Sequence, residues 1–544
     1  MKLLLSTFFM VCSFITLSQI NFNEIDSLMN NTYPSNEPGA SILISKKGEI
    51  IYQKAFGLAN LEHNVKNTPE HVFQIGSITK QFTAVSILLL VEQGKISLND
   101  SITKYIVDFP THNQHIKIHH LLTHTSGIKN YTNMSEWTKI WRQDLTPAEM
   151  ISVFKNEPLE FKPGEKFSYS NSGYFLLGYI IEKISGLTYS EFIEKNIFKP
   201  LAMYNSLYGS HTKLIQNRAN GYQKDTKYVN AEYLSLTQPY AAGSIMSNVN
   251  DLFLWNQAIM SFKLLKKETI QKAFTNYQLS NGSYTNYGYG WIINEINGNH
   301  TLEHSGGIFG FSSNGIYLPN EDVYVIVLTN KDNDTPSDIS TRIAAITIEK
   351  PYKTINTSFK LDSKYAQSLT GNYEFEDGTT RVITFEDGQL YSQREGGLKT
   401  KLIAINKTYF GYESNTFSHL KFILDKKGKH QVIHSVRINE TKGLKIMTKK
   451  QMSVEVTIEK TILQKYIGNY ELVPGFTIAI TEENGKLMCQ ATGQEKLELY
   501  PENETKFFLK VVDAKINFFA DHAGNFNKMV LYQNGREITG TRIK

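Results

Sequence analysis

The sequence predicts an α+β domain, built on a mostly antiparallel sheet with a helical subdomain, followed by two small antiparallel β-barrels. Three features of the 544-residue chain lead to this prediction. Strand-like segments lie at both ends of the region up to Lys350, and helical patterns lie between them. The remainder of the chain is rich in short strand-like segments and repeats itself at a fixed offset.

The first strand-like segments predict a β-hairpin. Ala40 to Ser45 and Glu49 to Phe56 are separated by a short turn that ends in glycine. A run that is apolar almost all round follows from Phe82 to Val91, just before Gly94. Such a run indicates a buried central helix rather than an amphipathic surface helix.

The middle of this region has mostly helical patterns, and strands return at its end. Helices are expected over His120 to Thr125, Pro147 to Phe154, Tyr174 to Ile184, Tyr189 to Ile197 and Asn250 to Met260. Strands are expected over Thr301 to Ser305, Ser313 to Leu318 and Val323 to Thr329. Strands from both ends of the region would close one sheet, so we expect a single domain over residues 19–350.

The C-terminal region is a tandem repeat. The sequence Gly-Asn-Tyr-Glu at Gly371 recurs 97 positions later at Gly468, and Gly388 and Gly485 have the same offset. Repeated units with many short strands and tight turns predict closed barrels, which have no exposed strand edges. We expect one barrel over residues 361–455 and another over 460–544. Such barrels can hold a ligand, but passive spacers or lids are the favoured interpretation.

The N-terminus has the pattern of an export signal. A basic start at Met1-Lys2 precedes an apolar stretch that ends at Leu17, which predicts a signal peptide over residues 1–18. A retained membrane anchor is less favoured, because about 15 apolar residues are too few to span a bilayer. A lipid anchor at Cys12 lacks the usual small residues before it. We expect a periplasmic or secreted protein with no transmembrane segment after cleavage.

Composition narrows the expected partners. The chain is 41% hydrophobic and 20% charged, as in ordinary soluble proteins, and its formal net charge of +5 is small for its length. No basic cluster alternates with aromatic residues, so nucleic acid is not an expected partner. Loss of Cys12 with the signal would leave Cys489 alone, so no intramolecular disulfide is expected. Nothing in the sequence indicates the oligomeric state.

Ser77 and Lys80 form the first candidate catalytic motif. Gly76 precedes the serine, and the apolar helical run follows it. Residues three apart share a helix face, so the lysine amine is expected to reach the serine hydroxyl. Burial and the helix N-terminus lower a lysine pKa, which favours a neutral amine that accepts the serine proton. The same spacing recurs at serines that lack this combination of a preceding glycine and a following buried helix: Ser101, Ser152 and Ser210.

Two further polar motifs follow at long intervals. Tyr169 and Asn171 lie in a segment rich in serine and glycine ahead of a helical pattern, where a phenol and an amide can point into one cleft. The second motif, His304-Ser305-Gly306-Gly307, ends a strand-like run. Glycines there let another backbone or a ligand approach closely, and a free N–H can complete an oxyanion hole with that of Ser77.

In this order the three motifs resemble those of the serine β-lactamase and penicillin-binding-protein superfamily, in particular its class C β-lactamase-like branch of esterases and D-aminopeptidases. The resemblance covers roughly residues 25–345 and includes Leu121 to Ile128 and Phe161 to Gly164. It implies a β-lactamase-like antiparallel sheet with helices on both faces. The two predicted barrels resemble the lipocalin-like barrels of three-domain D-aminopeptidases.

The resemblance also implies a role for each motif residue. Ser77 would be the nucleophile that forms an acyl-enzyme, Lys80 its activating partner, and Tyr169 a proton-transfer partner. Asn171 would contact the acyl group of the substrate. The backbone N–H of Gly307 is the candidate for the second oxyanion donor.

The third motif departs from the family pattern. It usually begins with lysine, whereas this chain has His304, which we predict to be a fourth catalytic residue, with Ser305, Gly306 and Gly307 as substrate-binding residues. A largely neutral imidazole attracts a substrate carboxylate less than a permanent cation does. In family terms this favours an esterase or D-aminopeptidase over an efficient β-lactamase.

A metal site is the alternative interpretation of a histidine cluster. His120 and His124 have the helical spacing of two zinc ligands, with His115 and His119 nearby. No glutamate lies between them as a general base, and the resemblance places the segment in the scaffold. We therefore expect structural histidines, no metal and no cofactor.

Together these features predict an exported serine hydrolase that cleaves a small amide or ester, with a D-amino-acid peptide as one candidate substrate. A β-lactamase or D-alanyl-D-alanine carboxypeptidase is the first alternative. The second alternative is a catalytically weak envelope protein whose barrels bind a ligand. The sequence does not identify the natural substrate.

Overall fold

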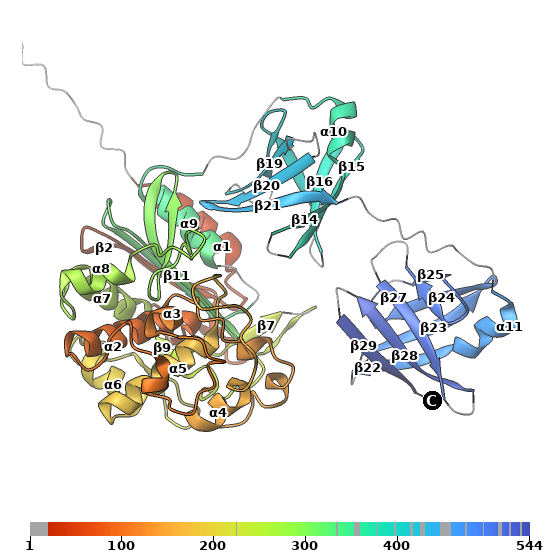
Figure 1. The fold of residues 1–544 in the computed structure, drawn as a ribbon. Coiled ribbons are helices and arrows are strands. Elements are labelled where there is room, and N and C mark those ends of the chain that lie inside the picture. Colours follow the sequence, from red (N-terminus) through yellow and green to blue (C-terminus); the bar gives the residue numbers. More distant parts are fainter. Residues whose placement is uncertain are drawn as a thin grey trace, which may run out of the picture. The chain divides into compact units, whose positions relative to one another are not determined.

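The computed structural model describes residues 20–543, except for residues 225, 333–335, 353–358, 377, 396–398, 414–416, 425–429, 447–457, 474–475, 493, 495, 510–513, 522–523 and 534–535. The predicted signal peptide and Cys12 lie outside the described residues. The chain forms two compact units (Figure 1): one extends to Lys353 and includes Arg437–Asn439, and the other contains the rest. In the described part of the chain, no helix is both long and apolar enough to cross a membrane.

The first unit combines helices with a large sheet and smaller strand pairs. Its α-helices are α1 Phe22–Thr32, α2 Thr79–Glu92, α3 Ile118–Leu122, α4 Pro147–Phe154, α5 Asn171–Ser185, α6 Tyr189–Ile193, α7 Val249–Met260, α8 Lys267–Ala273 and α9 Pro336–Thr347. Its strands are β1 Ala40–Lys46, β2 Glu49–Phe56, β3 Leu58–Asn60, β4 Val65–Lys66, β5 Phe73–Gln74, β6 Leu207–Tyr208, β7 Tyr222–Lys224, β8 Tyr228–Asn230, β9 Ile245–Ser247, β10 Ile292–Ile296, β11 Asn299–Ile308, β12 Phe311–Leu318 and β13 Val323–Thr329.

Both ends of this region contribute strands to one antiparallel sheet. The strand order is β10-β11-β12-β13-β1-β2, and Ala40 of β1 lies opposite Thr329 of β13. The predicted hairpin is therefore present as β1 and β2, and it pairs with the last strand of the domain. The predicted α+β fold with a mostly antiparallel sheet is confirmed.

Helices cover both faces of this sheet because its central strands are apolar on both sides. Ile42 and Val325 pack with residues of α1 and α9 on one face, and Leu43 and Ile326 pack with residues of α2 and α7 on the other. This alternation follows from the two-residue period of a β-strand. Figure 1 shows α1 and α9 together over the first face. Helix α2 is buried from Thr79 to Leu88 and has a core position, as its apolar sequence predicts.

Several helix boundaries in the middle of the domain differ from the sequence prediction, and the structure gives the physical reason for two of them. The segment expected to be helical over His120 to Thr125 forms α3 instead, which ends at Leu122. His124 has a positive φ of 57°, a conformation that stops a right-handed helix. Helix α5 begins at Asn171, three residues before the expected start, because the Ser170 side chain caps the helix by accepting a hydrogen bond from the Gly173 N–H.

The second unit contains two closed antiparallel barrels of eight strands each. The first is β14 Gly371–Phe375, β15 Thr380–Glu386, β16 Gln389–Arg394, β17 Lys399–Ala404, β18 Tyr409–Tyr412, β19 Ser418–Leu424, β20 His430–Val436 and β21 Asn439–Ile446, preceded by α10 Ser363–Leu369. The second is β22 Gly468–Val473, β23 Phe476–Glu483, β24 Lys486–Ala491, β25 Leu497–Pro501, β26 Lys506–Phe508, β27 Ala514–Ala520, β28 Phe526–Gln533 and β29 Arg536–Ile543, preceded by α11 Lys460–Leu463. The predicted pair of barrels is confirmed.

The sequence repeat corresponds to a repeated structural detail. Tyr373 and Tyr470 are both fully buried in the first strands of their barrels. Each phenol donates a hydrogen bond to the carbonyl four residues upstream, at Leu369 and Tyr466 respectively. Cys489 is buried in the core of the second barrel, where burial raises the pKa of its thiol to about 11.

Packing of α2 predicts a matched pair of stability changes. Leu88 is fully buried and Leu89 is only half-buried in the same helix. We expect Leu88→Ala to lower the unfolding free energy by about 2–5 kcal/mol because it leaves a cavity in the core, and Leu89→Ala to lower it less. Chemical denaturation followed by tryptophan fluorescence measures this, since the four tryptophans lie between residues 137 and 291. Equal losses in both variants would contradict the central position of α2.

Candidate active site

Ser77 lies on a tight turn at the start of the buried helix. Gly76–Ile78 forms a 3₁₀ turn that leads directly into α2. Gly76 has a φ of 51°, which a residue with a side chain adopts only at a cost, so glycine suits this position. Ser77 is half-buried, whereas Lys80, one turn later, is fully buried. The nucleophile candidate is thus accessible and its partner is shielded from water.

The Lys80 amine is the centre of the site. Its Nζ lies 3.0 Å from Ser77 Oγ, as the helical spacing predicts. The same Nζ donates hydrogen bonds of 2.8 Å to Asn171 Oδ1 and 2.8 Å to the backbone carbonyl of Ala242. Three segments that are far apart in the sequence therefore converge on one nitrogen.

These partners determine where the lone pair of a neutral amine would point. Burial holds the pKa of Lys80 well below its usual value. A neutral amine has two N–H donors and one lone pair. The oxygens of Asn171 and Ala242 can only accept, so they take both N–H donors, and the lone pair is left facing the Ser77 hydroxyl. This arrangement suits proton removal from a serine nucleophile.

Tyr169 and Asn171 lie next to the Lys80 amine, at the start of α5. The Asn171 side chain is held by Lys80 and by a 3.3 Å hydrogen bond from its Nδ2 to Thr132 Oγ1. The Lys80 nitrogen lies 4.7 Å from the centre of the Tyr169 ring. The sequence analysis predicted that Asn171 contacts the substrate, and the structure adds that it positions the lysine.

The Tyr169 phenol stays protonated at neutral pH. Burial raises its pKa above the usual value, and a hydrogen bond with Ser77 opposes that shift only in part. A neutral phenol that contacts the nucleophile oxygen can pass a proton in either direction during the reaction. Its position fits a proton-transfer partner better than a phenolate base.

The third motif lies on an open edge of strand β11. Strand β10 ends opposite Glu303, so His304 and the residues after it have no neighbouring strand on that side. The Ser77 turn lies against this edge: a Cβ added to Gly306 would come within 2.0 Å of the Ile75 carbonyl oxygen. Glycine at position 306 is therefore required for the close approach of the two segments.

Gly307 faces the cleft rather than the protein. It is exposed, and a Cβ added to it would meet no atom within 4 Å. Its backbone lies close to that of Gly76, because a Cβ on Gly76 would lie 2.8 Å from the Gly307 nitrogen. The backbone of Gly307 thus lies next to the turn that contains Ser77, a position that suits the predicted second donor of an oxyanion hole.

His304 is buried and neutral. Its Nδ1 lies 2.6 Å from the Ser305 carbonyl, which can only accept, so Nδ1 carries the hydrogen. Its Nε2 then accepts a 2.9 Å hydrogen bond from the Tyr287 hydroxyl. Burial and the nearby Lys80 lower the pKa of His304 to about 3. The third motif therefore brings no positive charge to the site at neutral pH.

Three contributions to the site were missed in the sequence analysis. The Ala242 carbonyl and the Tyr287 hydroxyl are hydrogen-bond partners of Lys80 and His304. His124 packs under Tyr169 with ring centres 4.2 Å apart, and its Nδ1 accepts a hydrogen bond from the Ser170 N–H. His124 has a left-handed backbone conformation, and strained residues of this kind concentrate at functional sites. This conformation marks His124 in the structure, but the sequence does not reveal it.

The histidine cluster has structural partners. His119 Nδ1 lies 2.9 Å from the Tyr289 hydroxyl, and His120 Nδ1 accepts from the Lys117 N–H in a cap of α3. His124 follows the end of the helix, so the spacing that suggested two zinc ligands is not helical. Within the described residues, no group of three or more histidine, cysteine, aspartate or glutamate side chains could hold a metal ion.

Residues 30–348, more than half of the chain, match the family model described as Beta-lactamase. The chain belongs to the beta-lactamase family. This confirms the resemblance to the superfamily of serine β-lactamases and penicillin-binding proteins. Residues 453–542 match a second model, described as a domain of unknown function (DUF3471), over the region of the second barrel.

This beta-lactamase family member is similar to several characterised proteins. It is 27% identical to a penicillin-binding protein of Bacillus subtilis (strain 168), over 97% of this chain and 100% of that protein. An octameric penicillin-binding protein homologue from Pyrococcus abyssi has a TM-score of 0.57 and 28% identity, over 78% of this chain and 100% of its own. A D-stereospecific amidohydrolase from Streptomyces sp. has a TM-score of 0.52 and 25% identity, over 60% of this chain and 98% of the amidohydrolase chain.

The lone pair of Lys80 predicts the pH dependence of hydrolysis. We expect kcat/KM for a neutral nitrophenyl ester to rise with pH as Lys80 loses its proton, below the usual lysine pKa of 10.5. Because the pKa of His304 is about 3, titration of His304 should not change kcat/KM near neutral pH. Because the pKa of Tyr169 is raised, kcat/KM should not fall on the alkaline side below about pH 10.

Arginine substitutions test the assignment of this rise with pH. Lys80→Arg replaces the base with a group that stays protonated, so we expect a roughly 10²–10⁴-fold loss of kcat/KM. Lys104→Arg is the matched control, because Ser101–Lys104 repeats the letters of Ser77–Lys80 at a surface where Lys104 pairs with Asp100. If kcat/KM of Lys80→Arg still rose with pH in the same way as that of the unchanged chain, the proposed role of the Lys80 amine would be contradicted.

The two glycines of the third motif give a second prediction. Gly306→Ala places a methyl group against the Ile75 carbonyl, so β11 and the Ser77 turn must separate, and we expect most of the activity to be lost. Gly307→Ala has open space for its methyl group and keeps its N–H, so the loss should be small. The rate of ester hydrolysis is compared between the two variants, after circular dichroism has shown that both are folded. A greater loss in Gly307→Ala would show that the close approach is not the constraint.

Proposed function

We propose that this chain is an exported serine hydrolase that forms an acyl-enzyme on Ser77 and cleaves a small amide or ester, with derivatives of D-amino acids as the substrate class. One observation carries the proposal: the Lys80 Nζ lies 3.0 Å from Ser77 Oγ and 2.8 Å from each of two acceptor-only oxygens, which leaves the lone pair of a neutral amine for Ser77 Oγ. Export is inferred from the N-terminal sequence alone.

The reaction follows from these positions. Lys80 takes the Ser77 proton as Oγ attacks the substrate carbonyl. The N–H groups of Ser77 and Gly307 hold the negative oxygen that develops. The leaving amine or alcohol takes a proton from the Tyr169 hydroxyl, which recovers one from Lys80, and water then releases the acyl group by the reverse sequence.

The D-amino-acid class is supported by similarity and by charge. A structural relative at 25% identity is a D-stereospecific amidohydrolase. The neutral His304 supplies no cation for a carboxylate next to the scissile bond, where penicillins and peptides ending in D-alanyl-D-alanine carry one. Esters and amides without that carboxylate fit the site better.

The alternative is a β-lactamase or D-alanyl-D-alanine carboxypeptidase. Similarity to a penicillin-binding protein along nearly the whole chain favours it. Under this alternative, β-lactams would acylate Ser77 at a useful rate in spite of the neutral third motif.

Hydrolysis of three substrates separates these functions. Initial rates are measured for a nitrophenyl ester, a D-alanyl nitroanilide and a chromogenic cephalosporin, with the full chain, Ser77→Ala and the control Ser101→Ala. We expect the ester and the anilide to be cleaved, the cephalosporin to be cleaved at least ~100-fold less efficiently, and all activity to disappear only in Ser77→Ala.

Each other outcome has a distinct meaning. Preference for the cephalosporin would establish the alternative. Equal activity in Ser77→Ala would remove Ser77 as the nucleophile. Absence of turnover of all three substrates would reject the proposed substrate class and favour the interpretation of a ligand-binding protein.

A further inference from the structure

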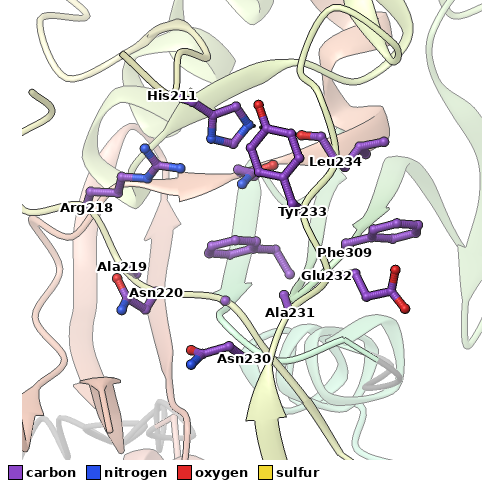
Figure 2. Close-up of a pocket in the computed structure, with 13 residues that line it drawn as sticks. His211, Arg218, Ala219, Asn220, Asn230, Ala231, Glu232, Tyr233, Leu234 and Phe309 are labelled. Atoms are coloured by element: carbon purple, nitrogen blue, oxygen red, sulfur yellow. Dashed lines mark hydrogen bonds between the residues drawn. The ribbon is translucent and has the colours of Figure 1, made fainter. Parts of the chain in front are cut away.

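A cavity of about 380 Å³ lies beside the third motif, within the first unit. Its lining includes Arg218, His211, Tyr233, Phe309 and Phe311. Figure 2 shows the Arg218 guanidinium, the His211 ring and the Tyr233 phenol at one end, and Asn220 and Asn230 at the other. Its volume and its mixture of aromatic and polar groups are those of a small-molecule site.

The cavity shares its walls with the segments that form the active site. Gln74 lines it and lies three residues before Ser77. The strand that contains Gln74 is continuous with Val72, whose backbone bridges that of Arg218. On the other side, Phe309 follows Gly307 by two residues at the end of β11. The cavity therefore lies beside the segments that contain Ser77 and Gly307.

The walls are held in place by close backbone packing. A Cβ on Gly221 would lie 3.1 Å from the Gly310 Cα, and the Ala231 N–H donates a 3.0 Å hydrogen bond to the Gly221 carbonyl. The loop that contains Arg218 is thus fixed to the turn between β11 and β12. The cavity is a formed part of the domain and not an opening between loose segments.

The Arg218 side chain brings a positive charge to the lining of this cavity. Its guanidinium is half-buried and donates a 3.2 Å hydrogen bond to the Ser210 carbonyl. Within the described residues it forms no ion pair with a carboxylate. Burial lowers the pKa of this guanidinium, because a partly desolvated charge is less stable than one in water. An anion from outside would compensate this charge.

The acidic residues around the cavity have other partners. The Glu232 carboxylate pairs with Arg142 at 3.0 Å. Glu62 hydrogen-bonds to Tyr222 and to Asn230, at the end of the cavity away from Arg218. His211 Nε2 lies 3.0 Å from the Leu234 carbonyl, so it donates there. Arg218 is left as the group that can bind an anion with its planar donors.

We propose that this cavity is a substrate subsite in which Arg218 binds a carboxylate carried by the substrate at a distance from the scissile bond. The inference rests on the proposed hydrolase function and specifies its substrate as an acidic one. The positive charge that the third motif does not bring to the site would then be supplied by Arg218. The carboxylate can belong to the acyl part or to the leaving part of the substrate.

Two matched substrate pairs identify which part carries the carboxylate. D-Glutamyl and D-glutaminyl nitroanilides differ only by a charged or neutral end in the acyl part. D-Alanyl-D-glutamic acid α-amide and D-alanyl-D-glutaminamide make the same comparison in the leaving part. The ratio of kcat/KM between charged and neutral members is measured for the full chain, Arg218→Gln, Arg218→Lys and the control Arg342→Gln, whose arginine pairs with Asp338 in α9.

We expect the full chain to prefer the charged member of one pair. Arg218→Gln should reduce that preference roughly 10- to 100-fold, the range for loss of a charged hydrogen bond. Arg218→Lys should restore part of it, and Arg342→Gln should leave it unchanged. A charged-to-neutral ratio that stays within about twofold in Arg218→Gln, for both pairs, would overturn the proposal.

A binding measurement separates this proposal from the hydrolase function. Ser77→Ala, which cannot form an acyl-enzyme, is titrated calorimetrically with glutarate and with the neutral glutaramide, with and without Arg218→Gln. Binding of glutarate that weakens at least ~10-fold on loss of Arg218 supports the subsite even if no substrate is hydrolysed. Turnover of neutral substrates with glutarate binding independent of Arg218 would keep the hydrolase and reject the subsite.

Discussion

The site depends on one buried nitrogen. The Lys80 amine connects the turn that carries Ser77, the start of α5 at Asn171 and the backbone at Ala242. A buried ammonium is costly, so the environment that shields Lys80 also favours its neutral form. Shielding is provided by the apolar helix α2 and its core. The chemistry of the site is thus a consequence of the packing of the domain, and the serine would be an ordinary hydroxyl without it.

The same neutrality extends to the rest of the site. Tyr169 and His304 are both uncharged near neutral pH, because burial disfavours their ionised forms. Ground-state recognition then depends on hydrogen bonds and on the fit of the cleft, while the charge that forms during attack meets the two backbone N–H groups. In this arrangement an anionic substrate needs a cation outside the catalytic groups, and Arg218 is placed in a cavity that shares walls with them.

The sequence was informative where local spacing determines geometry. Helical spacing placed Lys80 against Ser77, the hairpin and the last strands predicted the sheet, and the 97-residue repeat predicted two barrels. It was uninformative where the contact depends on tertiary packing. A backbone carbonyl such as that of Ala242 is present in every residue, and one tyrosine among thirty gives no sign that Tyr287 will reach His304. Helix α9 and strand β10 were missed for a related reason: their burial comes from the sheet that they cover or extend.

The topology of the sheet determines when the site can exist during synthesis. Strand β1 pairs with β13, and the Ser313 hydroxyl binds the Ile75 carbonyl 238 residues away. Ser77 is therefore synthesised long before β11, which contains the candidate oxyanion donor Gly307, by roughly 10–50 s at ordinary rates of translation. Pairings of such high contact order also form late in folding. A nascent or truncated chain that ends before β11 would contain Ser77 and Lys80 but not the strand against which the Ser77 turn packs, so we expect such a chain to be inert.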